Sequence, residues 1–315
     1  MNHPLGQACA LGAAITWAFA LVLFKRSGER IAPVALNLYK NAVGLTLLVA
    51  TLGLLILLGY ERLDGPRAYS RQEIGLLLLS GIIGIAVADT LFFHSLNLIG
   101  VGLISIVDCS YSPFAILFSW CLLAEMLTVF HYVGAALIVA GVFTASPHML
   151  PAKRTRRQIV SGMLLGTLSI ALMALGIVIA KPVLEKMPVL WATTLRLAAG
   201  FACLALFALG GQGWRRHWGV FRPTHSWRQA LPASVLGSYV CLLLWIAGFK
   251  YTGASIAAVL NQTSVVFASV LAAVVLKEHF GPRQAAALVL ALCGVAIMTA
   301  PEYLSFLLEL PGRTH

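Results

Sequence analysis

Long apolar segments separated by short polar ones dominate this chain of 315 residues. A membrane-spanning helix needs about 20 apolar residues, and turn signals such as Asp64-Gly65-Pro66 and Gly281-Pro282 mark where the apolar segments stop. The pattern predicts ten spans, at residues 5–24, 33–58, 74–97, 101–123, 129–146, 159–180, 188–210, 230–249, 253–276 and 282–300. A short amphipathic tail at 302–310 is expected to lie at the membrane surface. The predicted fold class is therefore an all-α polytopic membrane protein.

Composition supports this interpretation, because 60% of the residues are hydrophobic and only 10% are charged. Soluble domains average about 45–50% apolar and about 25% charged residues. The composition excludes a soluble enzyme, a nucleic-acid-binding domain and a disordered chain. The net charge of +11 is attributed to topology signals and lipid headgroup contacts, since Lys and Arg lie mainly between the apolar segments. We expect a multi-pass protein of the cell (inner or plasma) membrane, with no nucleic-acid partner.

Metal and cofactor chemistry finds no support in the sequence. All six cysteines lie inside apolar segments, and no C-x-x-C or H-E-x-x-H motif occurs. The absence of a G-x-x-x-x-G-K-[ST] motif argues against an ATP-driven pump. We therefore expect no metal, no cofactor and no catalytic residue.

The chain contains an internal repeat. Shifting the sequence by 153 positions places residues 80–142 on 233–295 without a gap, and a shift of 156 aligns the first two spans of each half. The predicted organisation is a first repeat at 1–146, a basic linker at 147–158, a second repeat at 159–300 and a tail at 301–315. Five spans per repeat make the second copy enter the membrane from the opposite side, and such 5+5 inverted repeats are common in secondary transporters. The Lys and Arg distribution between loops favours both termini outside the cytoplasm.

Two segments carry a family resemblance. The stretch Leu122–Val142, with Glu125, Gly134 and Gly141, resembles the end of an EamA domain, and Val275–Val295, with Glu278 and Gly294, resembles it again. The resemblance covers nearly the whole chain as two EamA-like halves and implies the drug/metabolite transporter superfamily. It implies a ten-helix carrier of small solutes without naming the solute. The basic residues Lys40 and Arg196 resemble the Arg of the family's second helix, although Lys40 departs from it, and Ala287 replaces the counterpart of Gly134.

Only two acidic residues lie inside the predicted spans, Asp89 and Asp108. A charge at the bilayer centre costs about 2.5–3.5 kcal/mol on insertion scales, so each is expected to face the interior. Each is a candidate for proton coupling or cation binding, and the alternative is a structural hydrogen bond between helices. His94 is a weaker candidate for a proton relay beside Asp89, with a buried structural histidine as the alternative.

Polar residues also gather on corresponding helices of the two repeats. Ser105, Asp108, Tyr111 and Ser112 follow a helical spacing, and Pro113 leaves the Cys109 carbonyl without its donor. Asn261 and Gln262 occupy the matching position of the second repeat. We expect these groups to line a cavity, with simple interhelical hydrogen bonding as the alternative.

The remaining candidates are basic or aromatic. Lys40 and Arg196 either reach the membrane surface or pair with an acidic residue or a substrate anion. Trp17, Trp245 and Tyr239 are candidates for a cavity wall, with packing as the alternative. Glu125 and Glu278 are expected to cap helices or pair with loops.

These features favour a secondary transporter in which two halves rock around a midplane site, with H⁺ as a candidate coupling ion. The expected partners are a small-molecule solute and membrane lipid, and the expected state is a monomer or weak dimer. One alternative is a membrane-embedded enzyme acting on a lipid or isoprenoid carrier, and another is a receptor or assembly factor without transport.

Overall fold

The structure is a computed structural model that describes residues 4–60, 69–123, 129–145, 155–184, 186–210, 217–222, 227–251, 254–278 and 281–309. Every element within these ranges is helical. In chain order they are α1 (Pro4–Gly28), α2 (Pro33–Leu57), α3 (Arg71–Gly81), η2 (Ile82–Ala88), α4 (Asp89–Asp108), α5 (Tyr111–Leu123), α6 (Val129–Ala145), α7 (Arg156–Leu184), α8 (Val189–Leu209), η3 (Gly219–Phe221), α10 (Trp227–Val235), η4 (Leu236–Val240), α11 (Cys241–Tyr251), α12 (Ala254–Val275) and α13 (Pro282–Glu309).

The helices match the apolar pattern of the sequence. Six described segments are long and apolar enough to cross a membrane, and four shorter apolar helices accompany them. Each of the ten predicted spans overlaps at least one of the described helices. The helix α13 extends from the tenth predicted span to Glu309 and so includes the described part of the tail predicted at 302–310. The position of this tail at the membrane surface stays a prediction.

Two interruptions lie in this part of the chain, one inside α4 and one between α4 and α5. Gly100 has φ 82° and ψ 176°, a conformation that side-chain-bearing residues rarely adopt, and the chain turns there. The span predicted at 101–123 is not one helix, because α4 ends at Asp108 and α5 begins at Tyr111. Pro113 explains the second break, since it lacks the N–H that would bond to the Cys109 carbonyl.

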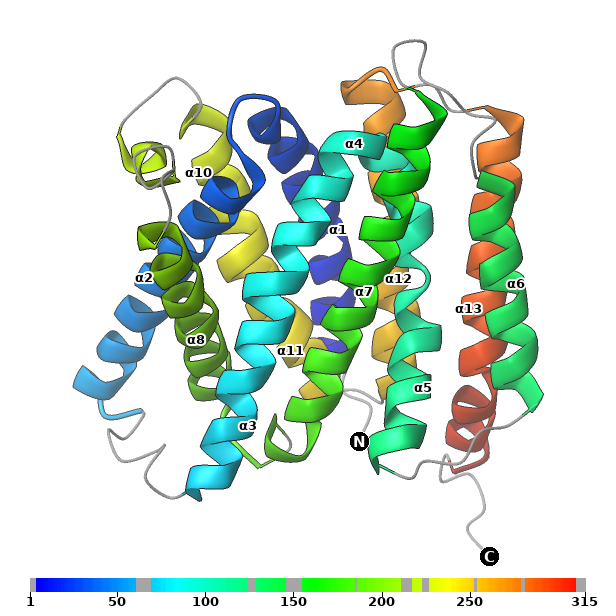
Figure 1. The fold of residues 1–315 in the computed structure, drawn as a ribbon. Helices are drawn as coiled ribbons and strands as arrows, with labels where there is room; N and C mark the ends of the chain where they lie inside the picture. The colour runs from blue at the N-terminus through cyan, green and yellow to red at the C-terminus, as the bar shows by residue number, and fades with distance from the viewer. Residues whose placement is uncertain are drawn as a thin grey trace, which may run out of the picture.

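The two repeats run in opposite directions and interleave. Figure 1 shows α1 rising and α7 descending, with both termini at the same end of the molecule. The first helix of each repeat packs on the other repeat: α1 contacts α11 and α12, whereas α7 contacts α4, η2 and α5. The repeats seen in the sequence are therefore not two separate packing units, and a simple rocking of one against the other does not describe this fold.

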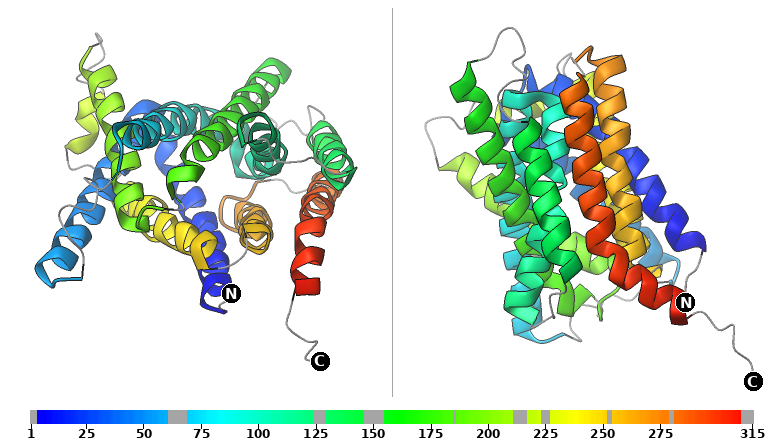
Figure 2. Two further views of the ribbon diagram at one scale, coloured as in Figure 1. Left: turned by 90° about the horizontal axis from the view of Figure 1, so that it is seen from below. Right: turned by 90° about the vertical axis from the view of Figure 1, so that its right-hand side faces the viewer.

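Small residues bring α6 and α13 together at one side of the bundle (Figure 2). A Cβ atom at Gly141 would lie 2.8 Å from the Ala287 carbonyl oxygen, and one at Gly294 would lie 2.6 Å from the Gly134 carbonyl oxygen. Gly141 and Gly294 are repeat-related, so the same close approach is made twice. Helix association in membranes depends on such close packing.

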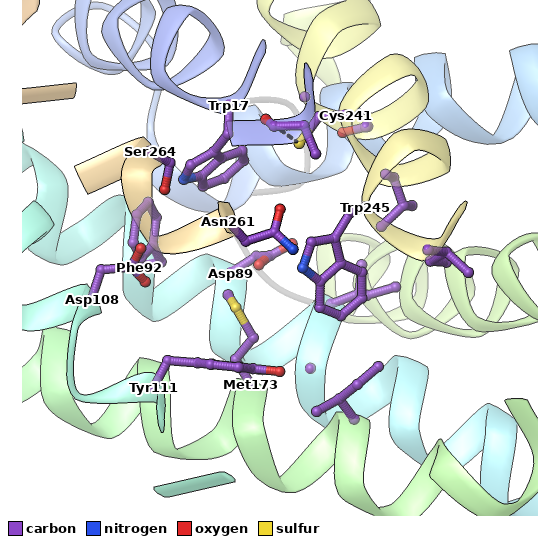
Figure 3. Close-up of a pocket in the computed structure, with 18 of the residues that line it drawn as sticks. Trp17, Asp89, Phe92, Asp108, Tyr111, Met173, Cys241, Trp245, Asn261 and Ser264 are labelled. Carbon is purple, nitrogen blue, oxygen red and sulfur yellow. Dashed lines mark hydrogen bonds between the residues drawn. The ribbon is translucent and has the colours of Figure 1, made fainter. Parts of the chain in front are cut away.

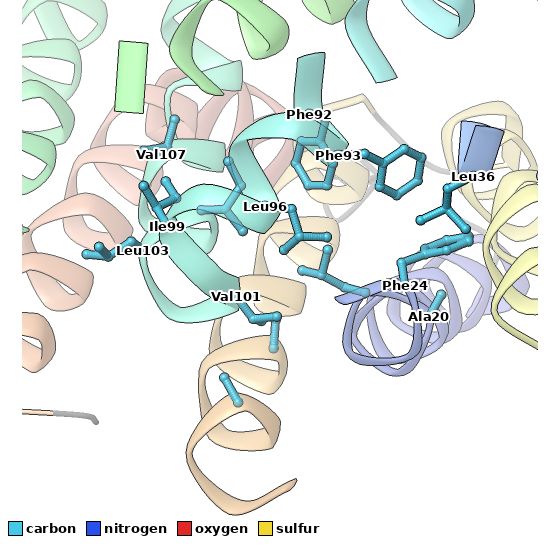
Figure 4. Close-up of a cluster of buried hydrophobic side chains, with 14 of the residues drawn as sticks. Ala20, Phe24, Leu36, Phe92, Phe93, Leu96, Ile99, Val101, Leu103 and Val107 are labelled. Carbon is cyan, nitrogen blue, oxygen red and sulfur yellow. The ribbon is translucent and has the colours of Figure 1, made fainter. Parts of the chain in front are cut away.

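The largest buried cluster lies around α1 and α4, where aromatic and aliphatic side chains from both repeats meet (Figure 4). The Phe24 and Phe93 rings pack edge to face with centroids 5.1 Å apart. This geometry is favourable for aromatic pairs, and it fixes α1 against α4 beside the cavity described below.

Charged side chains from both repeats stabilise the turn at Gly100. Glu278 accepts hydrogen bonds from the Val101 N–H at 3.0 Å and the Gly102 N–H at 2.8 Å. Lys25 donates to the Leu96 carbonyl at 3.1 Å, just before the turn. An anion at a helix start and a cation at a helix end both complement the helix dipole. Glu278 thus has the capping role expected for it, whereas Glu125 lies outside the described residues.

Removing this cap should lower stability. We expect Glu278→Ala to cost about 0.5–2 kcal/mol, the range measured for lost helix caps, and Glu278→Gln to cost less because an amide oxygen still accepts one bond. Thermal unfolding in detergent measures both variants. A Glu278→Ala protein that melts at the wild-type temperature would contradict the capping role.

Candidate functional site

A cavity of about 230 Å³ lies at the centre of the bundle. Figure 3 shows Asn261 projecting into it between Trp17 and Trp245, with Asp89, Asp108 and Tyr111 around it. Residues of α1, α2, η2, α4, α5, α7, α8, η4, α11 and α12 line the cavity. The sequence predicted a site between the third, fourth, eighth and ninth spans, and the structure adds the first, second, sixth and seventh.

The lining follows the internal repeat. Applying the shifts of 153 and 156 positions pairs most lining residues of the first repeat with lining residues of the second. The pairs are Trp17 with Met173, Lys40 with Arg196, Gly84 with Gly237, Ile85 with Ser238, Asp89 with Leu242, Phe92 with Trp245, Asp108 with Asn261, and Tyr111 with Ser264. The pseudo-two-fold axis therefore passes through the cavity, and the acidic residues lie only on the first-repeat side of the pairing.

Two π-helical segments contribute to the cavity wall. η2 and η4 occupy matching positions of the two repeats, and each contributes lining residues, among them Gly84 and Gly237. π-helical turns are rare and frequent at functional sites. Asn37 supports η2, because its amide donates to the Ile85 carbonyl at 2.9 Å and to the Thr90 hydroxyl at 2.9 Å.

An ion pair closes the first-repeat side. Lys40 Nζ lies 2.6 Å from Asp89 Oδ2, with both side chains largely buried. Lys40 also donates to the Asn41 side-chain oxygen at 3.1 Å, and Asn41 donates to Asn37 at 3.0 Å. Lys40 does not reach the membrane surface, which excludes that alternative for it. Its charge and that of Asp89 neutralise each other.

The second-repeat side is polar but unpaired. Arg196 is only 7% exposed, and no described residue forms an ion pair or hydrogen bond with its side chain. Thr193, Ser238 and Asn261 line the same cavity, and each has a buried polar side-chain atom without a partner among the described residues. Buried polar groups are nearly always hydrogen-bonded in folded proteins, so this wall of the cavity offers binding capacity to a ligand.

Asp108 and Tyr111 flank the break between α4 and α5. Both line the cavity, because the break exposes the end of one helix and the start of the next. Gln262 bridges this region to α12 through a hydrogen bond of 3.4 Å to the Ser112 hydroxyl. Broken helices at membrane depth are tolerated where they line a cavity.

Eight of the ten predicted site residues line this cavity: Lys40, Asp89, Asp108, Tyr111, Ser112, Arg196, Asn261 and Gln262. Ser105 does not line it. Its hydroxyl donates a hydrogen bond of 2.8 Å to the Val101 carbonyl of its own helix. His94 is exposed on α4 and lies off the cavity, on a different helical face from Asp89. Of the aromatic candidates, Trp17 and Trp245 line the cavity. Tyr239 does not, and its hydroxyl oxygen forms a hydrogen bond of 2.6 Å with the Thr51 hydroxyl oxygen.

Several lining residues carried no recognisable signal in the sequence. Thr193 and Ser238 are ordinary polar residues of apolar helices, and the π-helical geometry of η2 and η4 has no sequence signature. The repeat alignment offers a signal only for Thr193, which matches the polar Asn37, because Ser238 matches the apolar Ile85. Within the described part of the chain, no group of three or more His, Cys, Asp and Glu side chains could hold a metal ion.

Comparison with known proteins agrees with the repeat. The family model described as the EamA-like transporter family matches residues 4–146 and again residues 160–300. The chain belongs to the EamA-like transporter family. The two matches coincide with the two repeats and cover most of the chain, so this EamA-like protein carries two family domains.

Solved structures share the fold. One, described only as "Crystal structure of protein", has a TM-score of 0.60 and 19% sequence identity, and the similarity covers 94% of this chain and 98% of the other. At this identity the likeness concerns the fold alone. A search of curated proteins finds no match.

Proposed function

We propose that this EamA-like protein is a secondary transporter that carries a small solute through the central cavity by alternating access. In this proposal the chain crosses the cell membrane ten times as a 5+5 inverted repeat. The observation that carries the proposal is the cavity itself, which places buried charged and polar groups on a pseudo-two-fold axis between interleaved repeats. Transporters built from inverted repeats bind their substrates at such a position.

Buried charges without an ion-pair partner support a binding role for the cavity. Arg196 and Asp108 are expensive to place in a membrane interior, and neither has an ion pair with another described side chain. A purely structural bundle would gain stability from apolar residues at these two positions. Family membership favours transport and lends no support to the alternative of an enzyme acting on a lipid or isoprenoid carrier.

Uptake by proteoliposomes tests this function. The purified protein would be reconstituted, incubated with a mixture of small metabolites, and the vesicle contents compared by mass spectrometry with protein-free vesicles. Asn261→Trp fills the cavity centre and should reduce accumulation of the transported solute by about tenfold or more, or about 1.4 kcal/mol. The matched control is Val270→Trp on the same helix, because Val270 is 56% exposed on its outer side and should tolerate the larger side chain.

Equal accumulation by wild-type protein, both variants and empty vesicles would contradict transport through this cavity. Equal uptake by the wild type and Asn261→Trp, well above that of empty vesicles, would place the pathway elsewhere.

The proposal includes coupling of transport to protons through Asp108. This carboxyl group lines the cavity and has no hydrogen bond or ion pair with another described residue, so it is free to exchange a proton during the cycle. We expect Asp108→Asn to abolish the stimulation of uptake by an imposed pH gradient while solute exchange at equal pH persists. Stimulation of the Asn variant equal to that of the wild type would exclude Asp108 as the coupling group.

A further inference from the structure

We infer that Arg196, with Thr193, Ser238 and Asn261, forms a binding site for the carboxylate of a small organic monoanion with an apolar body. This inference rests on the proposed transport function and names the substrate class for its cavity. The Lys40–Asp89 pair is not part of this anion site, because its charges already satisfy each other.

The two repeats differ in the partner that each supplies to its buried cation. Lys40 and Arg196 occupy matching positions, but Asp89 has Leu242 as its counterpart. The first repeat thus supplies its buried cation with a carboxylate at 2.6 Å, whereas the second repeat supplies its cation with an apolar side chain. An Arg whose internal partner is missing is suited to pair with a carboxylate that comes from outside the protein.

Arg196 shares the cavity with other buried hydrogen-bond donors that have no partner among the described residues. Arg196 Nε, Asn261 Nδ2 and the hydroxyls of Thr193 and Ser238 are all buried without a partner among described residues, and all four residues line the cavity. Each of these groups can donate a hydrogen bond. A carboxylate accepts several such bonds, and the guanidinium adds a planar fork that matches its geometry. The four donors together therefore favour an anion with two equivalent oxygens.

The rest of the cavity defines the body of the solute. Trp17, Phe92 and Trp245 contribute aromatic walls, together with Met173 and Ile177. A cavity of about 150 Å³ is known to hold benzene, so 230 Å³ accommodates one ring or a short branched chain with its carboxylate. The walls thus favour an apolar body of that size.

Negative charge on the first-repeat side limits the solute to one carboxylate. Asp108 lines that side without an ion pair among the described residues, whereas Lys40 already neutralises Asp89, and a second anionic group on the solute would approach Asp108. Like charges in a low-dielectric site repel strongly. We therefore expect dicarboxylates to bind much more weakly than monocarboxylates of similar shape.

Binding of four matched probes tests the charge preference. The probes are phenylacetate, its neutral amide phenylacetamide, the cation phenethylamine and the dianion phenylmalonate, each measured by calorimetry with the full-length protein in detergent. We expect phenylacetate to bind at least about tenfold more tightly than each of the other three, equivalent to about 1.4 kcal/mol.

A mirror substitution tests the role of Arg196 without removing it. Leu242→Asp introduces in the second repeat the carboxylate that Asp89 supplies in the first, and it should occupy Arg196 internally. We expect it to weaken phenylacetate binding by about tenfold or more relative to Leu242→Asn, which has the same size but no charge. Lys186→Met, at a surface pair where Lys186 is 65% exposed, should bind phenylacetate as the wild type does.

The outcomes separate this inference from the transport function. Phenethylamine or phenylacetamide binding as tightly as phenylacetate, or equal phenylacetate binding by Leu242→Asp and Leu242→Asn, would overturn the carboxylate site. Failure of all four probes to bind would also overturn it. None of these results would affect the metabolite uptake measured in proteoliposomes, and only the loss of that uptake would remove the transport function.

Discussion

Replacing Asp89 by leucine is expected to destabilise the protein by about 3–5 kcal/mol, because it leaves the Lys40 ammonium buried without its partner. The two charges are 2.6 Å apart and largely shielded from solvent. Leucine is the residue that the second repeat carries at the matching position, Leu242. We expect the unpaired charge to cause most of the loss and the change of side-chain shape to cause the rest.

The double variant Lys40→Met/Asp89→Leu separates the two effects. Removing both charges should recover most of the lost stability, since buried ion pairs can often be replaced by apolar groups at little cost. Thermal unfolding in detergent measures the recovery, with Lys186→Met at the exposed surface pair as the control that should melt like the wild type. A double variant as unstable as Asp89→Leu would show that the pair does not account for the loss.

Replacing Gly81 by alanine should also be strongly destabilising. A Cβ atom there would overlap the carbonyl oxygen of Arg196 on α8, and a backbone atom of a packed helix cannot move aside as a flexible side chain can. Overpacking of this kind typically costs about 1–3 kcal/mol, occasionally more. Because the displaced residue is Arg196, we also expect weaker binding of phenylacetate.

Gly75→Ala is the matched control for this prediction. Gly75 lies on the same helix, α3, but outside the neighbouring backbone of that helix no atom lies within 4 Å of the Cβ position. Alanine has a higher helix propensity than glycine, by about 1 kcal/mol, so this variant should be as stable as the wild type or slightly more stable. Equal melting temperatures for the Gly81→Ala and Gly75→Ala proteins would contradict the close contact between α3 and α8.

The sequence predicted much of this fold because lipid imposes a strong and simple pattern. Apolar segments of sufficient length located the helices, and the gap-free alignment with its paired glutamates Glu125 and Glu278 revealed the repeat. The pattern could not show that α1 and α7 exchange places between the repeats, because that depends on helix packing and leaves no periodic signal. It also could not show the π-helical turns, since Ile82–Ala88 reads as any apolar helix.

The candidate site was predictable where charge made it conspicuous. Asp89, Asp108, Lys40 and Arg196 stand out because so few charges lie inside the spans. Only the structure shows that Lys40 pairs with Asp89. Only the structure shows that no described carboxylate pairs with Arg196 in the same way. The five-residue spacing places His94 on a different face of α4 from Asp89. Its exposure makes both predictions for it wrong, the proton relay and the buried structural histidine.

Accessibility of the cavity from both sides of the membrane tests most directly whether a solute is transported through it. Cys241 lines the cavity, and a variant in which the other five cysteines are replaced by alanine keeps it as the only thiol. The measurement is the rate at which a membrane-impermeant thiol reagent modifies this cysteine in oriented vesicles, applied outside in one experiment and inside in the other. Alternating access predicts modification from either side, slowed in both cases by the tryptophan of Asn261→Trp. Modification from one side only, with none from the other at any reagent concentration, would show a closed-ended pocket and contradict transport through this cavity.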